Sequence, residues 1–250
     1  MSKFCVSDAS TRVDYMMYLH DGLSPLLVEC GAGVGLSNDG DRCVLAVECE
    51  KTAEELILNE MQSLVAEILV VGYKYEYFSR KLKPQGLTEG ERELLLSALI
   101  SADELEDARY VKRKFQEKKE IAIDGIFHFL LSPLREKWDE IAGYIPSVFV
   151  KGELVDFIVF LLGEKCPKTC YVDEKTVCDN TFRPLHRTRL TGESDSLKIV
   201  RELLLAGATD VDLMSEIPAE DESYIRAFYG DRVTFSGQRK MAAEKVVKKG

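Results

Sequence analysis

Two helix-then-strand segments near the end of the chain decide its fold, LKIVRELLLAGATDVDL at residues 197–213 and ESYIRAFYGDRVTF at residues 222–235. In each segment a helical pattern ends at a glycine, Gly207 or Gly230, which can adopt the left-handed conformation that closes a helix. Alternating apolar residues then predict a short strand. Because strands joined through a helix usually pair in parallel with a right-handed crossover, residues 166–238 are predicted to form a small α/β subdomain with a partly parallel sheet.

This subdomain is expected to open with two short strands, at residues 169–173 and 176–180, which a turn at Glu174-Lys175 connects. Residues 192–196 favour the cap of the helix that follows rather than a catalytic loop. The end of the chain, residues 239–250, is rich in lysine and alanine and predicts a frayed helix or a disordered tail.

Residues 52–165 upstream predict four or five helices. Thr52 and Glu55 have the spacing of a capping box, and apolar residues recur at intervals of three and four from there to Phe78, which predicts one long helix. The capping signature returns at residues 88–91 and 101–104. An apolar stripe that begins at Leu105 is expected to run on to residue 130 as helix.

Two prolines affect where helices begin and end in the second half of this helical block. Ser132-Pro133 can start or bend a helix, because proline suits the first turn and disrupts the interior. Ile145-Pro146 marks the next break. A last helix, with apolar residues on one side, is expected to end near Gly163.

The first residues of the chain are β-prone. Strands are predicted at residues 3–7, 26–30 and 42–49, with a short helix over residues 12–19 and a turn-rich stretch at residues 38–41 that indicates a hairpin. The fold class is therefore α+β. Its parts are expected to be an N-terminal β-rich segment (1–51), a helical block (52–165), the α/β subdomain (166–238) and the tail (239–250).

Composition excludes several classes of function. The 250 residues are 46% hydrophobic and 30% charged, as in an ordinary globular protein. The net charge of −10 argues against nucleic acid as the partner, since binding phosphates needs a concentrated basic surface.

The start of the chain lacks the apolar stretch of a signal peptide, and the apolar runs are too short to cross a bilayer. Seven scattered cysteines fit a reducing compartment. A cytoplasmic protein without a membrane partner is expected.

Two motifs are candidates for a ligand-binding site. Gly31-Ala32-Gly33-Val34-Gly35 is similar to a phosphate-binding loop, but turn residues follow it where a helix should begin, so a flexible hairpin loop is expected. Cys166, Cys170 and Cys178, with His186 as a fourth ligand, form the one cysteine cluster. Its spacing is not that of zinc ribbons, and cysteines in strands are common core residues. We expect neither a metal nor a cofactor.

Basic stretches are the other candidates. Residues 182–189, FRPLHRTR, offer arginine forks that could bind a phosphate or an acidic partner, or could be a solvated loop. The run Lys112-Arg113-Lys114 has acidic neighbours and predicts a charged outer helix face. The three histidines, His20, His128 and His186, are far apart in the sequence, and none is near a nucleophile pattern, so no catalytic residues are assigned. His128 is expected to be partly buried in a helix.

The order of these pieces resembles the YtxC-like family of sporulation proteins. Asp124, Gly125 and Phe129 match the family's aspartate-glycine-aromatic stretch, and the Phe157-Ile158 pair matches its glutamate-rich helix. Leu130 stands where the family often has arginine, and residues 232–237 contain none of the cysteines common at its end. The resemblance implies a sporulation-linked cytoplasmic role and no particular reaction.

Two functions remain open from the sequence. The first is a non-enzymatic sporulation protein that binds another protein, with the helical block presenting the contact surface. The second is an enzyme or ligand-regulated domain whose site lies at the carboxyl ends of the C-terminal strands. Residues 214–218 and 236–239 would line that site, and Arg187 or Arg189 would supply its polar groups.

Overall fold

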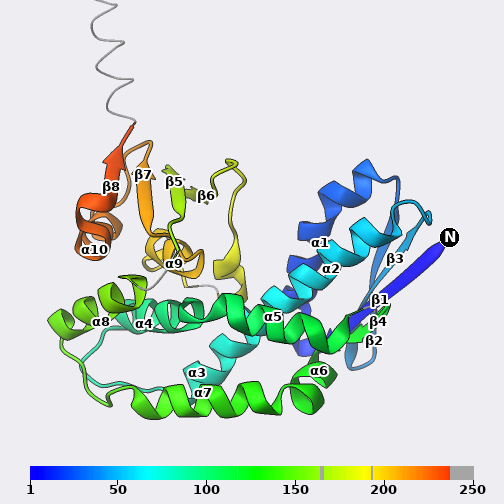
Figure 1. Cartoon of the computed structure of the whole chain (residues 1–250), viewed down its shortest axis with the longest axis horizontal. Helices are drawn as coiled ribbons and strands as arrows, with labels where there is room; N and C mark the ends of the chain where they lie inside the picture. The colour runs from blue at the N-terminus through cyan, green and yellow to red at the C-terminus, as the bar shows by residue number, and fades with distance from the viewer. Residues whose placement is uncertain (117, 164–165, 193, 237–250) are drawn as a thin grey trace, which may run out of the picture. The chain divides into compact units, whose positions relative to one another are not determined.

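The computed structural model describes residues 1–116, 118–163, 166–192 and 194–236, and its fold is α+β, as predicted (Figure 1). The chain divides into two compact units that are not contiguous in sequence. Unit 1 comprises Met1–Lys81 and Asp103–Ile145, and unit 2 comprises Leu82–Ala102 and Pro146–Gly250. The helical region 52–165 is thus shared between the two units. The predicted tail at 239–250 lies outside the described residues.

Unit 1 contains a four-stranded sheet in the order β2-β3-β1-β4. Its strands are β1 (Ser2–Ala9), β2 (Gly33–Asp39), β3 (Arg42–Cys49) and β4 (Glu120–Ala122). The β2–β3 hairpin is antiparallel, and β4 pairs in parallel with β1. A short helical turn, η1 (Ser10–Arg12), and helix α1 (Val13–Glu29) connect β1 to β2. The predicted order strand, helix, strand, strand is confirmed.

The first strand of the hairpin was predicted too early. Residues 26–29 form the end of α1, because Leu23 and Leu27 extend the buried stripe of Met16 and Leu19 by two more turns. The glycine-rich residues 33–35 belong to β2 itself, so the expectation of a flexible loop there is wrong. Gly40, with φ of 62°, begins the two-residue turn between the strands.

The long helix predicted from residue 52 onward is confirmed as three continuous segments, α2 (Glu54–Glu67), η2 (Ile68–Tyr73) and α3 (Lys74–Lys81). The middle segment η2 is π-helical, and all six of its residues are buried. Thr52 does not cap this helix, because the N-cap position is Ala53 and it receives no side-chain hydrogen bond. By length and composition alone, Glu54–Lys81 could also cross a membrane, but 61% of its most apolar window is buried inside the protein, as in a core helix.

Three further helices complete unit 1: α5 (Glu104–Phe115), α6 (Ile123–Leu130) and α7 (Ser132–Tyr144). The apolar stripe from Leu105 does not continue as one helix to residue 130. Strand β4 interrupts it, with Ile121 paired to Val6 of β1. Ser101 does not cap α5, since its hydroxyl donates back to Ala98 inside the preceding helix. The predicted helix start at Ser132-Pro133 is confirmed.

Unit 2 contains the sheet β6-β5-β7-β8, in which β5, β7 and β8 are mutually parallel, as the opening segments predicted (Figure 1). Its strands are β5 (Thr169–Asp173), β6 (Thr176–Cys178), β7 (Asp210–Leu213) and β8 (Val233–Phe235). Its helices and short helical turns are α4 (Glu89–Ala102), α8 (Lys151–Gly163), η3 (Arg187–Leu190), α9 (Lys198–Leu205), α10 (Ala219–Tyr229) and η4 (Gly230–Arg232). Both closing glycines have positive φ, 66° at Gly207 and 53° at Gly230.

Two helix caps in unit 2 had different outcomes. The capping box at residues 88–91 is confirmed: the Thr88 hydroxyl accepts the Glu91 backbone N–H, and the Glu91 carboxylate accepts the Thr88 N–H at 2.9 Å. The cap expected at residues 192–196 for α9 is wrong. Asp221, on α10, accepts the Val200 N–H instead, so that cap comes from a residue distant in sequence.

Candidate functional site

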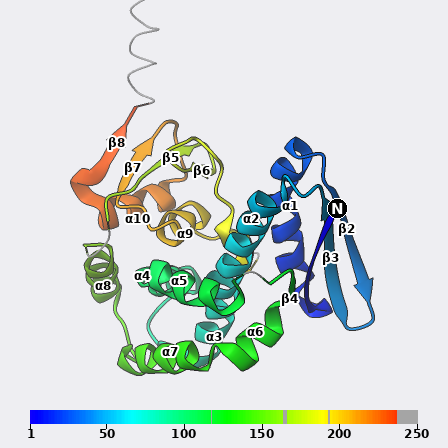
Figure 2. The same cartoon turned by 45° about the vertical axis from the view of Figure 1, so that its right-hand side comes forward.

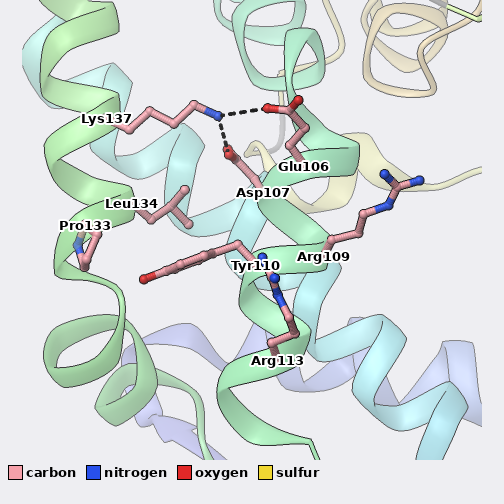
Figure 3. A pocket seen from close by; sticks show the side chains of 8 residues that line it. All are labelled: Glu106, Asp107, Arg109, Tyr110, Arg113, Pro133, Leu134 and Lys137. Atoms are coloured by element: carbon pink, nitrogen blue, oxygen red, sulfur yellow. Dashed lines mark hydrogen bonds and ion pairs between the residues drawn. The ribbon is translucent and has the colours of Figure 1, made fainter.

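A groove of about 450 Å³ lies between α5 and α7 in unit 1 (Figure 3). Its size is within the range in which proteins bind small ligands or single side chains of a partner. Eight residues line it: Glu106, Asp107, Arg109, Tyr110, Arg113, Pro133, Leu134 and Lys137. The set combines cationic groups, carboxylates and an apolar wall.

The cationic groups on α5 are the guanidinium groups of Arg109 and Arg113. The two residues are four apart, so they lie one turn apart on the same side of the helix. Both are exposed, and within the described part of the chain neither forms an ion pair or a hydrogen bond. An anion could therefore bind them without first breaking an existing interaction.

The wall of the groove is apolar. The Tyr110 ring extends from α5 toward α7, where Pro133 and Leu134 face it (Figure 3). Leu134 is only 4% exposed, whereas Pro133 lies at the surface. A ligand with an apolar or aromatic part would bury area against this wall, which is the main source of affinity for neutral groups.

A buried ion network closes one end of the groove. Asp107 is 1% exposed, and its carboxylate accepts hydrogen bonds from Lys137 Nζ at 2.8 Å, Lys74 Nζ at 2.9 Å and Trp138 Nε1 at 3.0 Å. Asp103 binds the same two lysines. Two ammonium groups thus compensate two carboxylates, which is the condition for burying charge.

The pKa values of this network follow from its geometry. Burial alone would raise the pKa of Asp103, but Lys74 and Lys137 together hold it below its ordinary value. Burial likewise opposes the charge on Lys137, yet its hydrogen bonds to Asp103 and Asp107 raise its pKa. Lys137 therefore stays charged and bridges α7 to α5.

A second polar cluster lies at the adjacent carboxyl ends of the parallel strands β1 and β4. Asp8, at the end of β1, is fully buried and accepts the Tyr73 hydroxyl at 2.8 Å. Burial raises the pKa of Asp8 in spite of this bond. Arg12 stacks over the Tyr73 ring and binds Glu76 through two hydrogen bonds of 2.9 Å. These side chains bind one another, so we assign the cluster a structural role.

The cysteines predicted as possible metal ligands do not converge. Cys178 pairs directly with Tyr171 across the β5–β6 ladder, so those two residues share a face of the sheet. Cys170, the neighbour of Tyr171, points to the opposite face and is buried, while Cys166 is exposed. Among the described residues, no three His, Cys, Asp or Glu side chains come close enough to hold a metal.

No two of the three histidines lie on the same helix or strand. His20 lies on α1 and contacts Asp21, and His186 is exposed in unit 2. His128 is also exposed, so the prediction that it is partly buried is wrong. It falls on the outward side of α6 because Ile126 and Phe127 take the buried positions.

Arg187 does not reach the carboxyl ends of the C-terminal strands. Arg187 donates to the carbonyl of Leu205, the last residue of α9, at 2.6 Å. The chain enters β7 at Asp210 shortly afterwards, so Arg187 lies at the amino-terminal edge of that sheet. It therefore cannot supply polar groups to a site at the opposite edge.

The loops at the carboxyl edge use their own polar groups. The Ser215 hydroxyl accepts the backbone N–H of Glu174, and Asp212 accepts the N–H of Ser236 at 3.1 Å. Residues 237–239 of the expected lining lie outside the described residues. Within the described residues, these bonds connect the strand ends to one another.

The exposed helix face predicted for Arg113 is confirmed, but the groove was not predicted. The available signal was the four-residue spacing of Arg109 and Arg113 around Tyr110 on one side of α5. Its partner wall, Pro133 and Leu134, is distant in sequence, and nothing in the local pattern indicates that α7 packs beside α5.

No protein-family model matches the chain. Comparisons with curated proteins and with solved structures likewise found no match. The geometry of the groove and the resemblance described above are therefore the grounds for a functional proposal.

Proposed function

We propose that this is a non-enzymatic protein that binds an acidic segment of another protein in the groove between α5 and α7. The observation that supports the proposal is the pair Arg109 and Arg113, two exposed guanidinium groups at the rim of a groove with an apolar wall, which bind no other described residue. They stand out in a chain whose net charge is −10. A basic rim attracts acidic partners.

The chemistry of the groove favours a carboxylate-bearing side chain next to an apolar one. Guanidinium groups bind carboxylates through two parallel hydrogen bonds, which are stronger than neutral ones. An adjacent apolar side chain would pack on Tyr110 and Leu134. Tyrosine and arginine are also the residue types that most often dominate binding energy at protein interfaces.

We propose sporulation as the setting, because the chain resembles the YtxC-like family. The residues that carry this resemblance have defined places in the fold. Asp124 binds Arg42 of β3, and Gly125 donates its N–H to Asp124 at 2.8 Å. Phe129, the aromatic position of the same stretch, is 82% exposed, which suits a surface for contact with another protein.

The alternative proposal, an enzyme or ligand-regulated domain with its site at the carboxyl ends of the C-terminal strands, has less support. Arg187 lies at the other edge of the sheet, and Ser215 and Asp212 accept hydrogen bonds from backbone N–H groups of neighbouring segments. Binding of a small ligand to a form of the protein with both groove arginines replaced would favour this alternative.

The test combines a deletion with matched charge reversals in the native host. Heat-resistant spore counts should fall on deletion and recover with the wild-type gene. The double variant Arg109→Glu/Arg113→Glu should fail to restore them. Lys83→Glu/Lys175→Glu changes the net charge equally at two exposed positions that do not line the groove and should restore them fully.

Two results would count against the proposal. Unchanged spore counts on deletion would contradict sporulation as the setting. Full rescue by Arg109→Glu/Arg113→Glu, with normal protein levels, would show that the groove is not the binding site. A photo-reactive residue in place of Tyr110 would report the partner directly, since a crosslink that Arg109→Glu/Arg113→Glu abolishes must form at the groove.

A further inference from the structure

The outer edge of the N-terminal sheet is an unpaired strand. β2 is the outermost strand in the order β2-β3-β1-β4, and no other strand of the described chain pairs with its free side (Figure 2). The strand is seven residues long. Its unpaired N–H and C=O groups form a row that can accept another strand.

This edge lacks the features that usually protect a free strand. Natural edges carry lysine, proline or a bulge, or are very short. Residues 33–38, GVGLSN, contain neither proline nor a charged residue, and Asp39 at the end is the one charge of the strand. The β2–β3 register runs through without an extra residue, so there is no bulge.

The apolar residues of β2 are incompletely covered. Val34 and Leu36 pair with Val47 and Leu45 of β3, so all four lie on the core face of the sheet. Val47 and Leu45 are fully buried, whereas Val34 is 38% exposed and Leu36 is half-buried. A strand added beside β2 would cover both.

The glycines of β2 have no evident role within one copy of the chain. A side chain added at Gly35 would meet nothing within 4 Å, and one at Gly33 would meet a single backbone atom at 4.0 Å. Neither has a positive φ. Glycine inside a strand often marks a place where another backbone approaches closely.

The geometry points to a second copy of this chain as the occupant: we infer that two copies pair antiparallel through β2 about a twofold axis at Leu36. In a hairpin with a two-residue turn, the closing pair Asp39–Arg42 is hydrogen-bonded, so Val34, Leu36 and Asn38 direct their N–H and C=O groups outward. Pairing about Leu36 then forms about six hydrogen bonds between the copies.

Charge also suits this register. It places Leu36 opposite its own copy, Val34 opposite Asn38, and Asp39 opposite Gly33, so no like charges face each other. Such an interface is isologous, because the same surface serves both copies and the pairing closes at a dimer. This inference is independent of the groove between α5 and α7.

Sedimentation equilibrium of the full chain tests it, from low micromolar to several hundred micromolar protein. The wild type should be a dimer. Leu36→Lys, which places two ammonium groups opposite each other, should weaken the dimer at least about tenfold. An equimolar mixture of Leu36→Lys and Leu36→Glu should restore it, and the control Leu56→Lys, at an exposed leucine of α2, should leave it unchanged.

A wild type that remains monomeric throughout this range overturns the inference, and so does a dimer that survives Leu36→Lys. If circular dichroism shows that Leu36→Lys is unfolded, Asn38→Pro decides instead. Proline at this outward-facing position removes one intermolecular N–H donor from each copy, two per dimer, and leaves the hydrogen bonds to β3 intact. Unimpaired dimerisation of a folded Asn38→Pro protein would also overturn the inference.

Discussion

Tyr73 and Lys74 are consecutive residues of one helix, yet they bind carboxylates in two different networks. The Tyr73 hydroxyl donates to Asp8 at 2.8 Å, and the Lys74 ammonium donates to Asp107 at 2.9 Å. Both side chains are buried, and so are all six residues of the π-helical segment Ile68–Tyr73 that ends at the first of them. Because a helix buried on all sides has no solvent-facing stripe, consecutive residues on different sides of it can both contact buried carboxylates.

Replacing Lys74 should be costly. Lys74→Met leaves Asp103 and Asp107 with Lys137 as their one remaining ammonium partner, and an uncompensated buried carboxylate costs about 3–5 kcal/mol. Urea unfolding should show this loss. The matched change Lys112→Met, at an exposed position on α5, should stay within about 0.5 kcal/mol of the wild type. A small effect at Lys74 would mean that water reaches the network.

Glycine 72 is required by close packing. A Cβ atom at this position would lie 2.8 Å from the Tyr15 ring, so Gly72→Ala should destabilise the protein by about 1–3 kcal/mol. Gly143→Ala is the control, because a Cβ atom there meets nothing within 4 Å. Helix propensity predicts that this control gains up to about 1 kcal/mol. Equal changes in thermal stability for both variants would contradict the packing argument.

Asp8 should make stability depend on pH. Burial raises its pKa in the folded protein above the ordinary 3.8, so the folded state binds more protons than the unfolded state between about pH 4 and the raised pKa. The contribution of Asp8 to stability therefore falls as the pH rises through this window. The unfolding free energy of the wild type minus that of Asp8→Asn should therefore decrease as the pH rises from 4. A difference that grows would show that Arg12 and Tyr73 outweigh burial.

The Thr88–Glu91 capping box offers a local test in unit 2. Thr88→Ala removes the hydroxyl that accepts the Glu91 N–H and should cost about 1 kcal/mol. Thr52→Ala is the control, because Thr52 makes no such bond at the start of α2. Denaturant unfolding monitored by circular dichroism would separate the two, and a loss in the control alone would reverse the assignment of the caps.

The parts of the fold that local signals specify could be predicted from the sequence. The closing glycines at 207 and 230 and the strand at 169–173 follow from residues within a few positions of each other. β4 could not be predicted in this way, because Ile121 becomes a strand residue only where it lies beside β1.

The groove had the same limitation, since Tyr110 and Leu134 belong to helices that no pattern pairs. The π-helical segment could not be predicted either, because an apolar run from residue 68 to 73 is equally typical of an ordinary α-helix. Packing between distant segments decides these features, and periodicity within one segment does not report it.

The two units share the chain in an order that constrains its synthesis. The polypeptide leaves unit 1 after Lys81, returns at Asp103, and leaves again after Ile145. A nascent chain therefore makes α4 before unit 1 can close, and α4 must wait for residues beyond 146 to bury its apolar side chains. During translation, this largely buried helix is exposed for as long as the ribosome needs to add the C-terminal sheet. In that interval the apolar side chains of α4 form the kind of exposed surface that chaperones bind.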